Sequence, residues 1–274
     1  MNIMFCGDSH AEDGILITTL SLLKNTSTPL HFYILTMYAE GYTAFNQQAF
    51  RLIKKLLKEK DPNNTAELID CTELFKKEPP RANMETRFTP YAMLRLFADQ
   101  LPQIPDRILY LDDDIIVRKD ISDFYNQDLT NIELVGVLDF WGRFFFHNIH
   151  THKPFDYLNS GVLLLNMSEI KKTQLFAKVR EKMSDKKMLL PDQSALNKLA
   201  TEKKIAPRCY NEQYRLRTDT KIQHFTTSFR FKPYFHTLTV KPWDIERVHS
   251  VLKLHEYDDL LKQYTELRSQ LKRA

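Results

Sequence analysis

Cysteine is scarce in this chain, which has only three among its 274 residues. Cys6, Cys71 and Cys209 lie far apart, so they form neither the close pairs of a structural zinc site nor an even disulfide framework. We therefore expect a reduced, intracellular protein with a cytoplasmic location. The chain also lacks a basic leader before Asp8, which predicts that it carries no secretory signal.

Long hydrophobic runs are missing as well. The most apolar stretch, residues 161–167, has the length of a strand and falls short of the ~20 residues that a membrane-spanning helix needs. Glycine is also rare, with six residues, while 43% of the chain is hydrophobic and 12% is aromatic. This composition is typical of an ordinary globular protein with a substantial core.

Charge is unevenly distributed around the net value of +4, since residues 198–274 carry 16 Lys and Arg against 9 Asp and Glu. A basic end suits an anionic partner, which leaves a phosphorylated ligand, an anionic membrane surface and nucleic acid open at this point. Residues 257–271 have the apolar spacing of an amphipathic helix. Such a helix either packs on the core, which is its commonest role, or lies on a membrane surface.

Three successive aspartates interrupt an apolar stretch in the middle of the chain. Residues 107–111 are typical of a buried strand, Asp112, Asp113 and Asp114 follow, and residues 115–117 are apolar again. Like charges so close together resist desolvation unless a positive charge lies among them. In an extended chain Asp112 and Asp114 point to one side and Asp113 to the other. The triplet favours a divalent-cation site, and a solvated polar turn is the alternative.

Alternating strand and helix patterns predict an α/β fold. The first strand (residues 2–6), the turn at Asp8 and the helix after it are typical of the opening of a nucleotide-binding unit, whose ligands bind at the carboxyl ends of strands. Asp8 is therefore a candidate ligand-binding residue, or else it caps the helix. Further strands are expected at residues 30–36, 66–70, 107–111, 133–138 and 159–166, and further helices at residues 45–57, 91–101, 168–183 and from 191 onward.

Several polar residues have an ordinary structural explanation beside a functional one. Arg95 lies in an apolar helix and needs a strong acceptor, or packs its stem on the core with its guanidinium in water or paired with a carboxylate. Asp192 follows Pro191 at a helix start, where it is the natural N-cap. The segment 141–152 is aromatic and rich in histidine, but its His147, His150 and His152 fit no strong metal template. This segment is expected to be a loop that forms an acceptor pocket or lid.

Four motifs in this order resemble glycosyltransferase family 8. They are Leu109-Tyr110-Leu111-Asp112-Asp113-Asp114, residues 159–166, Pro191-Asp192-Gln193, and His224-Phe225 followed by Lys241-Pro242-Trp243. The resemblance covers about residues 1–245 and implies a GT-A fold, a Rossmann-like mixed sheet flanked by helices. It divides the chain into a catalytic domain, 1–245, and a basic amphipathic helical segment, 246–274.

The resemblance also implies roles for individual residues. The two outer aspartates and the distant histidine hold Mn²⁺, or Mg²⁺, in such enzymes. The implied metal ligands are Asp112, Asp114 and His224, and the implied donor-binding residues are Asp8, Arg95, Asp113, Asp139, Asn159 and Lys241. Asp192 would hold the donor sugar, and Gln193 would lie beside its anomeric carbon in a positioning and electrostatic role. A divalent ion suits this chemistry because it neutralises the departing diphosphate.

The resemblance implies a retaining enzyme that transfers a hexose, glucose or galactose, from a UDP-sugar to a hydroxyl of a glycan or glycolipid. No nucleic-acid partner is then expected. The basic charge of the segment 246–274 makes it a candidate for peripheral contact with the inner face of the membrane, with packing on the core as the alternative. Clustered aspartates also fit a metal-dependent phosphohydrolase, and a carbohydrate-binding or nucleotide-sugar-binding module without catalysis is a further alternative. Three departures affect recognition: His10 and Ala11 after Asp8, Ser194 after Gln193, and a long segment between His224 and Lys241.

Overall fold

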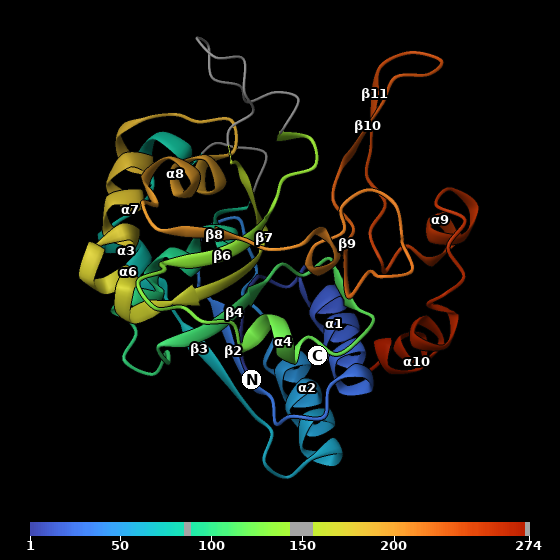
Figure 1. Ribbon diagram of the computed structural model, residues 1–274. Coiled ribbons are helices and arrows are strands. Elements are labelled where there is room, and N and C mark those ends of the chain that lie inside the picture. Colours follow the sequence, from blue (N-terminus) through green and yellow to red (C-terminus); the bar gives the residue numbers. More distant parts are fainter. Residues whose placement is uncertain (85–88, 143–155, 272–274) are drawn as a thin grey trace.

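The protein folds around one seven-stranded sheet, as a computed structural model shows for residues 1–84, 89–142 and 156–271 (Figure 1). The strand order is β3-β2-β1-β4-β7-β6-β8. Their bounds are β1 Asn2–Cys6, β2 His31–Thr36, β3 Thr65–Asp70, β4 Arg107–Leu111, β6 Leu134–Leu138, β7 Leu158–Asn166 and β8 Lys203–Ile205.

The sheet is mixed, as the sequence predicts. β3, β2, β1 and β4 run parallel, β7 is antiparallel to both β4 and β6, and β8 is parallel to β6. The carboxyl ends of β1 and β4 therefore lie at the same edge. Polar residues that follow these two strands are brought to that edge, where open α/β sheets bind their ligands.

Helices cover both faces of the sheet. On one face lie α1 (Glu12–Asn25), α2 (Gln47–Lys60) and α10 (Asp258–Arg268). The other face carries the 3₁₀ helix η2 (Pro90–Gln100) together with α3 (Thr72–Lys77), α6 (Met167–Thr173), α7 (Leu175–Asp185) and α8 (Pro191–Leu199). Each face has its own hydrophobic cluster, because alternate residues of a buried strand point to opposite faces.

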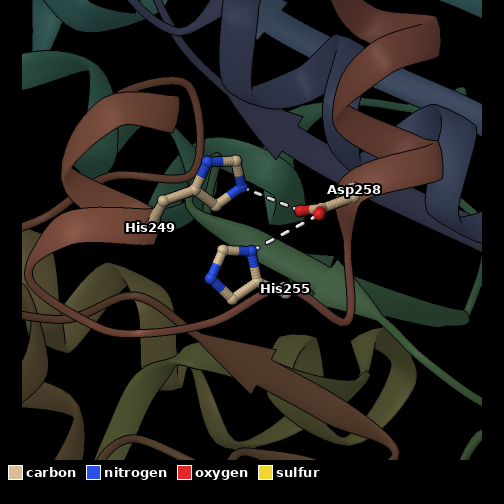
Figure 2. Close-up of side chains that lie close together, drawn as sticks. All are labelled: His249, His255 and Asp258. Carbon is tan, nitrogen blue, oxygen red and sulfur yellow. Dashed lines mark hydrogen bonds and ion pairs between the residues drawn. The ribbon is translucent and has the colours of Figure 1, made fainter.

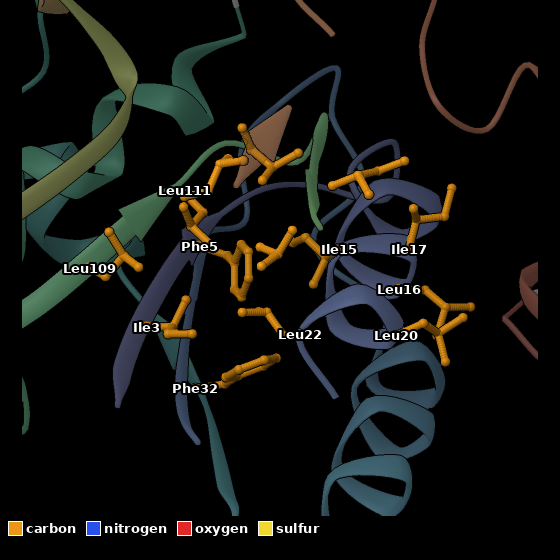
Figure 3. Close-up of a cluster of buried hydrophobic side chains, with 14 of the residues drawn as sticks. Ile3, Phe5, Ile15, Leu16, Ile17, Leu20, Leu22, Phe32, Leu109 and Leu111 are labelled. Atoms are coloured by element: carbon orange, nitrogen blue, oxygen red, sulfur yellow. The ribbon is translucent and has the colours of Figure 1, made fainter. Parts of the chain in front are cut away.

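The cluster under α1 shows how this packing follows from the sequence (Figure 3). Ile3 and Phe5 of β1 point to this face, while Met4 between them belongs to the cluster on the other face. Phe5 meets Phe32 of β2 edge to face, with ring centroids 5.2 Å apart. Ile15 from α1 is fully buried against them. The strand period of two thus assigns each apolar residue to one of the two layers.

Two expectations about the later elements are wrong. The single helix predicted at 168–183 is two helices, α6 and α7, because Gln174 between them adopts a left-handed conformation with φ of 58°. The charged residues and the Pro79-Pro80 pair of the segment 76–86 also predict a loop, yet α3 extends to Lys77 and a 3₁₀ turn, η1, spans Arg81–Asn83. Both departures are local, and the surrounding layers keep their order.

Two pairs of short strands lie outside the main sheet. β5 (Ile115–Val117) pairs with β9 (Ile222–His224), and β10 (Ser228–Arg230) pairs with β11 (His236–Leu238) in a hairpin. Three more short elements lie outside the sheet: α4 (Ser122–Tyr125), the 3₁₀ turn η3 (Arg208–Tyr210) and α9 (Ile245–Ser250). Within the described residues no helix is both long and apolar enough to cross a membrane.

The C-terminal helix α10 packs on α1. Its residues Leu260, Leu261 and Tyr264 are buried in the same cluster as α1, and the Tyr264 hydroxyl donates to Asp13 Oδ1 at 2.6 Å. The sequence leaves two roles open for this helix, and its apolar face packs on the core.

Candidate active site

The three aspartates form a turn between β4 and β5. The backbone N–H of Asp112 donates to the carbonyl of Gly161 in β7 at 2.8 Å, and the next two residues turn the chain before β5 begins at Ile115. The expectation of an extended chain with alternating side chains is therefore wrong for this segment. The turn nevertheless brings Asp112 and Asp114 together, so the grouping is as predicted although its cause is different.

Asp112, Asp114 and His224 offer three ligand atoms that lie within 4.8 Å of one another. His224 reaches the turn because β9 pairs with β5 in a register that places His224 opposite Ile115. Its Nε2 lies 2.9 Å from Asp114 Oδ1 and 3.7 Å from Asp112 Oδ2. The three residues that the resemblance names as metal ligands thus converge on one point.

A chain of amides fixes which nitrogen of His224 carries its proton. Asp139 Oδ2 is an acceptor and takes a hydrogen bond from Asn159 Nδ2 at 3.0 Å, so Asn159 turns its oxygen toward Asn211, which donates to it at 2.9 Å. The oxygen of Asn211 then faces His224 Nδ1 at 3.1 Å. Nδ1 must be the protonated nitrogen, and the lone pair of a neutral His224 lies on Nε2, toward the aspartates.

This arrangement fits a divalent cation. A lone pair on His224 Nε2 that faces two carboxylates is repulsive unless a proton or a cation lies between them. Asp114 Oδ1 is buried and meets only His224 Nε2, at 2.9 Å, so a cation between the two atoms would take the place of a shared proton. Two carboxylates and an imidazole are a donor set for Mn²⁺ or Mg²⁺, with a borderline nitrogen ligand that favours Mn²⁺.

The surroundings of the turn shift the pKa values of Asp113 and Asp114 in opposite directions. Burial alone would raise the pKa of Asp114, but His224 and Lys241 outweigh it and hold this pKa well below its usual range. Loss of hydration and the neighbouring Asp114 raise the pKa of Asp113 to about 7. For His224, burial would lower the pKa, yet Asp114 raises it above the ordinary value. Asp114 is thus held ionised, as it would have to be in order to bind a metal ion.

Glycine at position 161 leaves room for the side chains of Asp112 and His224. A Cβ added to Gly161 would lie 2.3 Å from Cε1 of His224 and 2.5 Å from Oδ2 of Asp112. Any side chain here would push the two ligands away from their common point. The glycine in the sequence 159–161 therefore serves the site directly, a role that the sequence alone does not reveal.

Arg95 is buried among acidic partners. Its guanidinium donates to the carbonyl of Ser160 at 2.6 Å, pairs with Asp192, and lies 3.6 Å from Asp112 Oδ1. It also stacks over the ring of Tyr110, whose hydroxyl donates to Asp112 at 2.6 Å. Of the sequence alternatives, pairing with carboxylates is therefore the one realised, and the pairing links η2 to the aspartate turn.

Asp192 is not a helix cap. The N-cap of α8 is Leu190, and Asp192 lies in the first turn, where it is buried and paired with Arg95. The capping explanation fails because the helix begins at Pro191, two residues earlier than a cap at Asp192 would require. Asp192 and Gln193 then share the first turn of α8 and both face the buried side.

Gln193 and Asp139 belong to one hydrogen-bonded network with Asn159. Gln193 Nε2 donates to Asp139 Oδ2 at 3.2 Å, and its Oε1 accepts from the backbone N–H of Ser160 at 2.9 Å. The other oxygen of Asp139 accepts from the N–H groups of Trp141 and Gly142 at 3.0 and 2.7 Å. Through Asn159 and Asn211, this network connects the Gln193 amide and the Asp139 carboxylate to His224.

Lys241 and Asp8 complete the set of predicted residues. Lys241 pairs with Asp114 and lies 3.5 Å from the carbonyl of Phe225, so its positive charge is beside the aspartate turn. Asp8 is buried just after β1, where its carboxylate accepts from the backbone N–H of His10 at 2.9 Å. Asp8 thus lies at the predicted sheet edge and also stabilises its own turn.

A second cluster near the C-terminus also has the residues to hold a cation (Figure 2). His249 Nε2 and His255 Nδ1 lie 2.8 and 3.4 Å from the two oxygens of Asp258, and the imidazole rings stack 4.7 Å apart. Because the three groups satisfy one another at the surface, this cluster has an ordinary structural explanation. The segment 143–155, with His147, His150 and His152, lies outside the described residues.

Sequence reasoning missed three residues of the site: Asn211, Ser160 and Gly161. Ser160 and Gly161 are part of a motif quoted for the resemblance, but their backbone roles have no signature in the residue type. Asn211 lies in an irregular stretch, and the backbone hydrogen bonds between the next residue, Glu212, and β9 bring it beside His224.

Solved structures of glycosyltransferases with the GT-A fold share the overall fold of this chain. The galactosyltransferase LgtC, in complex with donor and acceptor sugar analogues, superposes with a TM-score of 0.67 at 17% identity and covers 98% of this chain and 100% of its own. The bifunctional glycosyltransferase WbbM superposes with a TM-score of 0.69 at 15% identity, over 99% of this chain and 51% of its own. The fold is therefore GT-A.

The chain belongs to glycosyltransferase family 8, whose family model matches residues 2–246. Among curated relatives, lipopolysaccharide 1,2-glucosyltransferase of Escherichia coli K12 is 26% identical over 93% of this chain and 76% of its own length. A putative glycosyltransferase of Haemophilus influenzae is 26% identical over 72% of this chain, and GlyA of Streptococcus pneumoniae is 28% identical over 69%. The chain spans only 58% and 24% of the lengths of these last two.

Proposed function

We propose that the protein is a retaining, metal-dependent glycosyltransferase that moves a hexose from a UDP-sugar to a hydroxyl of a glycan or glycolipid acceptor. The observation that carries this proposal is the convergence of Asp112, Asp114 and His224 at the carboxyl edge of β4, beside Lys241. A diphosphate leaving group needs concentrated positive charge at the bond that breaks.

Asp112, Asp114 and His224 would hold Mn²⁺, or Mg²⁺, which when bound supplies charge neutralisation for the diphosphate. Lys241 would add a second positive charge on the same side, exchanging its ion pair with Asp114 for a phosphate oxygen. Asp8, at the end of β1, would meet the nucleotide, and Asp113 would face its ribose or a structural partner. These roles follow the family resemblance and agree with the place of each residue at the sheet edge.

The donor sugar would lie against Asp139, Asn159, Asp192 and Gln193. Arg95, which pairs with Asp192, would hold that carboxylate in place. Gln193 is held at both ends of its amide, by Asp139 and by the backbone of Ser160. An amide held in this way is a poor nucleophile but a well-placed dipole. We assign it the positioning of the anomeric carbon and the electrostatic stabilisation of charge that develops there.

Glucose and galactose are the hexoses we expect. The relatives include the lipopolysaccharide 1,2-glucosyltransferase described above and a lipopolysaccharide 1,3-galactosyltransferase of Salmonella typhimurium. Their names support a hexose donor and a cell-surface glycan acceptor for this chain. A cytoplasmic location near the inner face of the membrane, and a catalytic unit ending near residue 245, remain our predictions.

The test is a screen for UDP release from UDP-glucose, UDP-galactose and other UDP-sugars, with and without Mn²⁺. We expect release from a UDP-hexose that depends on Mn²⁺ and increases with a suitable acceptor. Release of inorganic phosphate from a phosphate ester, with no dependence on a UDP-sugar, would instead favour a phosphohydrolase. Tight UDP-sugar binding without turnover on a broad acceptor panel would favour a binding module without catalysis.

A further inference from the structure

The hairpin formed by β10 and β11 projects from the body of the protein (Figure 1). Its strands pair in antiparallel register from Ser228 with Leu238 to Arg230 with His236, and residues 231–235 form its tip. The hairpin lies in the long segment between His224 and Lys241. None of the roles proposed above for the donor or the metal uses its tip.

The tip exposes three large aromatic side chains to solvent. Phe231, Tyr234 and Phe235 are 63%, 71% and 59% exposed, and they lie within five residues of one another. Other large apolar side chains that are exposed in the described part of the chain, such as Tyr38 and Leu189, are scattered over separate elements. Single exposed apolar residues are ordinary, but a contiguous aromatic tip on a projecting hairpin marks an interaction surface.

The charge around the tip has one sign. Residues 221–243 contain no Asp or Glu, whereas Arg230 and Lys232 flank the first aromatic residue of the tip. Aromatic rings beside lysine and arginine are the combination found where proteins meet the headgroup region of a bilayer. Anionic lipids complement this charge and add attraction for each basic residue near their surface.

Aromatic packing holds the hairpin base in place beside the candidate active site. Phe229 stacks on Phe235 with centroids 5.8 Å apart and meets the ring of Trp141 at 5.1 Å. The backbone N–H of Trp141 donates to Asp139, a member of the donor-side network. The tip is therefore connected through packed rings to the site, at a distance fixed by the fold.

We propose that the hairpin tip inserts its three aromatic side chains into the headgroup region of an anionic phospholipid bilayer. The buried apolar face of α10 packs on α1, so the hairpin and not that helix supplies the membrane-facing apolar surface. Insertion would hold the Trp141 side of the candidate active site next to the membrane. The inference concerns lipid binding and does not depend on the transfer reaction.

The test is cosedimentation of the full chain with vesicles of phosphatidylcholine alone and of phosphatidylcholine mixed with phosphatidylglycerol. We expect binding to the mixed vesicles that weakens with salt, and about tenfold or greater loss of binding in the variant Phe231→Ser/Tyr234→Ser/Phe235→Ser. The matched control Tyr38→Ser/Leu189→Ser removes exposed apolar side chains elsewhere and should bind as the unaltered chain does.

Charge variants separate the hairpin from the C-terminal helices. Lys232→Glu should weaken vesicle binding, while Lys253→Glu/Lys262→Glu should leave it within about twofold. Equal thermal unfolding midpoints would show that each variant is folded. Unchanged binding in the aromatic variant, equal loss in its control, or no preference for anionic vesicles would overturn the proposal. So would a tip that drives only self-association, seen as a dimer that the aromatic variant abolishes without any lipid binding.

Discussion

Asn211 shows how a single buried amide orients the imidazole of His224, which we propose as a metal ligand. It is fully buried, donates to Asn159 and accepts from His224. The chain of hydrogen bonds that begins at the Asp139 carboxylate therefore continues through Asn159 and Asn211 to the imidazole. Residues of this kind fix both the tautomer and the ring orientation of the ligand. At the scale of the residue, the site is therefore more than its three ligands.

Replacing Asn211 with Ala should raise the Mn²⁺ concentration needed for half-maximal activity by about 10- to 100-fold, because His224 loses the partner that orients it. At saturating Mn²⁺ much of the turnover should return. Titration of activity with Mn²⁺ measures this change. Asn63→Ala, at an exposed position away from the site, is the matched control. An unaltered Mn²⁺ requirement in Asn211→Ala would contradict the positioning role.

The three aspartates should differ in their response to amidation. Asp112→Asn and Asp114→Asn each remove a charged ligand and should abolish metal-stimulated transfer, whereas Asp113→Asn should be milder. UDP release at a series of Mn²⁺ concentrations measures the effect. His255→Ala, which disrupts the surface cluster of Figure 2, should leave the Mn²⁺ dependence unchanged. Equal losses at all three aspartates would refute their separate roles.

At the scale of the element, β7 is the strand that shapes the site. It lies between β4 and β6, and its residues 159–161 contribute an amide, a backbone carbonyl and the space that only glycine leaves. The strand is buried along its length, so its backbone is held in place by both neighbours. Rigid placement of this kind is what a binding constellation requires.

Gly161→Ala should weaken Mn²⁺ binding strongly, because its methyl group would collide with His224 and Asp112. Isothermal titration with Mn²⁺ in the presence of UDP measures the affinity. Gly41→Ala is a useful contrast, since its Cβ meets nothing within 4 Å but its φ of 79° suits only glycine. That variant should lose about 1 kcal/mol of stability and retain its Mn²⁺ affinity. Equal Mn²⁺ affinity in both variants would contradict the steric argument.

Helix α10 should contribute to the stability of the whole core. Leu261 is 2% exposed and packs in the cluster of α1, so Leu261→Ala should lower the free energy of unfolding by about 2–5 kcal/mol. Urea denaturation followed by circular dichroism measures this. The neighbouring Lys262 is exposed, and Lys262→Ala should change stability by no more than about 0.5 kcal/mol. A small effect at Leu261 would mean that α10 is not part of the cooperative core.

At the scale of the whole molecule, the sequence predicts the strands of the sheet and the aspartate triplet of the candidate site because their signals are local. Strand periodicity marks β1, β4 and β7, and three adjacent aspartates are conspicuous after an apolar strand. The turn that joins Asp112 to Asp114 was not predictable from alternation, since tertiary contacts with β7 bend the chain there. Asn211 and the break at Gln174 were missed because the first depends on the contact of Glu212 with β9 and the second on backbone conformation.

Arg95 illustrates the same limit across the molecule. Its surroundings in the sequence are apolar, but its partners Asp192 and Ser160 come from α8 and β7. A buried guanidinium needs such partners, and the sequence cannot state which of several acidic residues supplies them. The family resemblance implies that Arg95 lies near the donor site, but only the fold reveals that it contacts Asp192 and Ser160.

The most direct test of the central claim is anomalous diffraction at the manganese edge from crystals grown with Mn²⁺ and UDP. We predict an anomalous peak within bonding distance of Asp112, Asp114 and His224, with the UDP phosphates on its open side and Lys241 beside them. The absence of a peak there, or a peak confined to His249, His255 and Asp258, would contradict the assignment of this site as the metal centre.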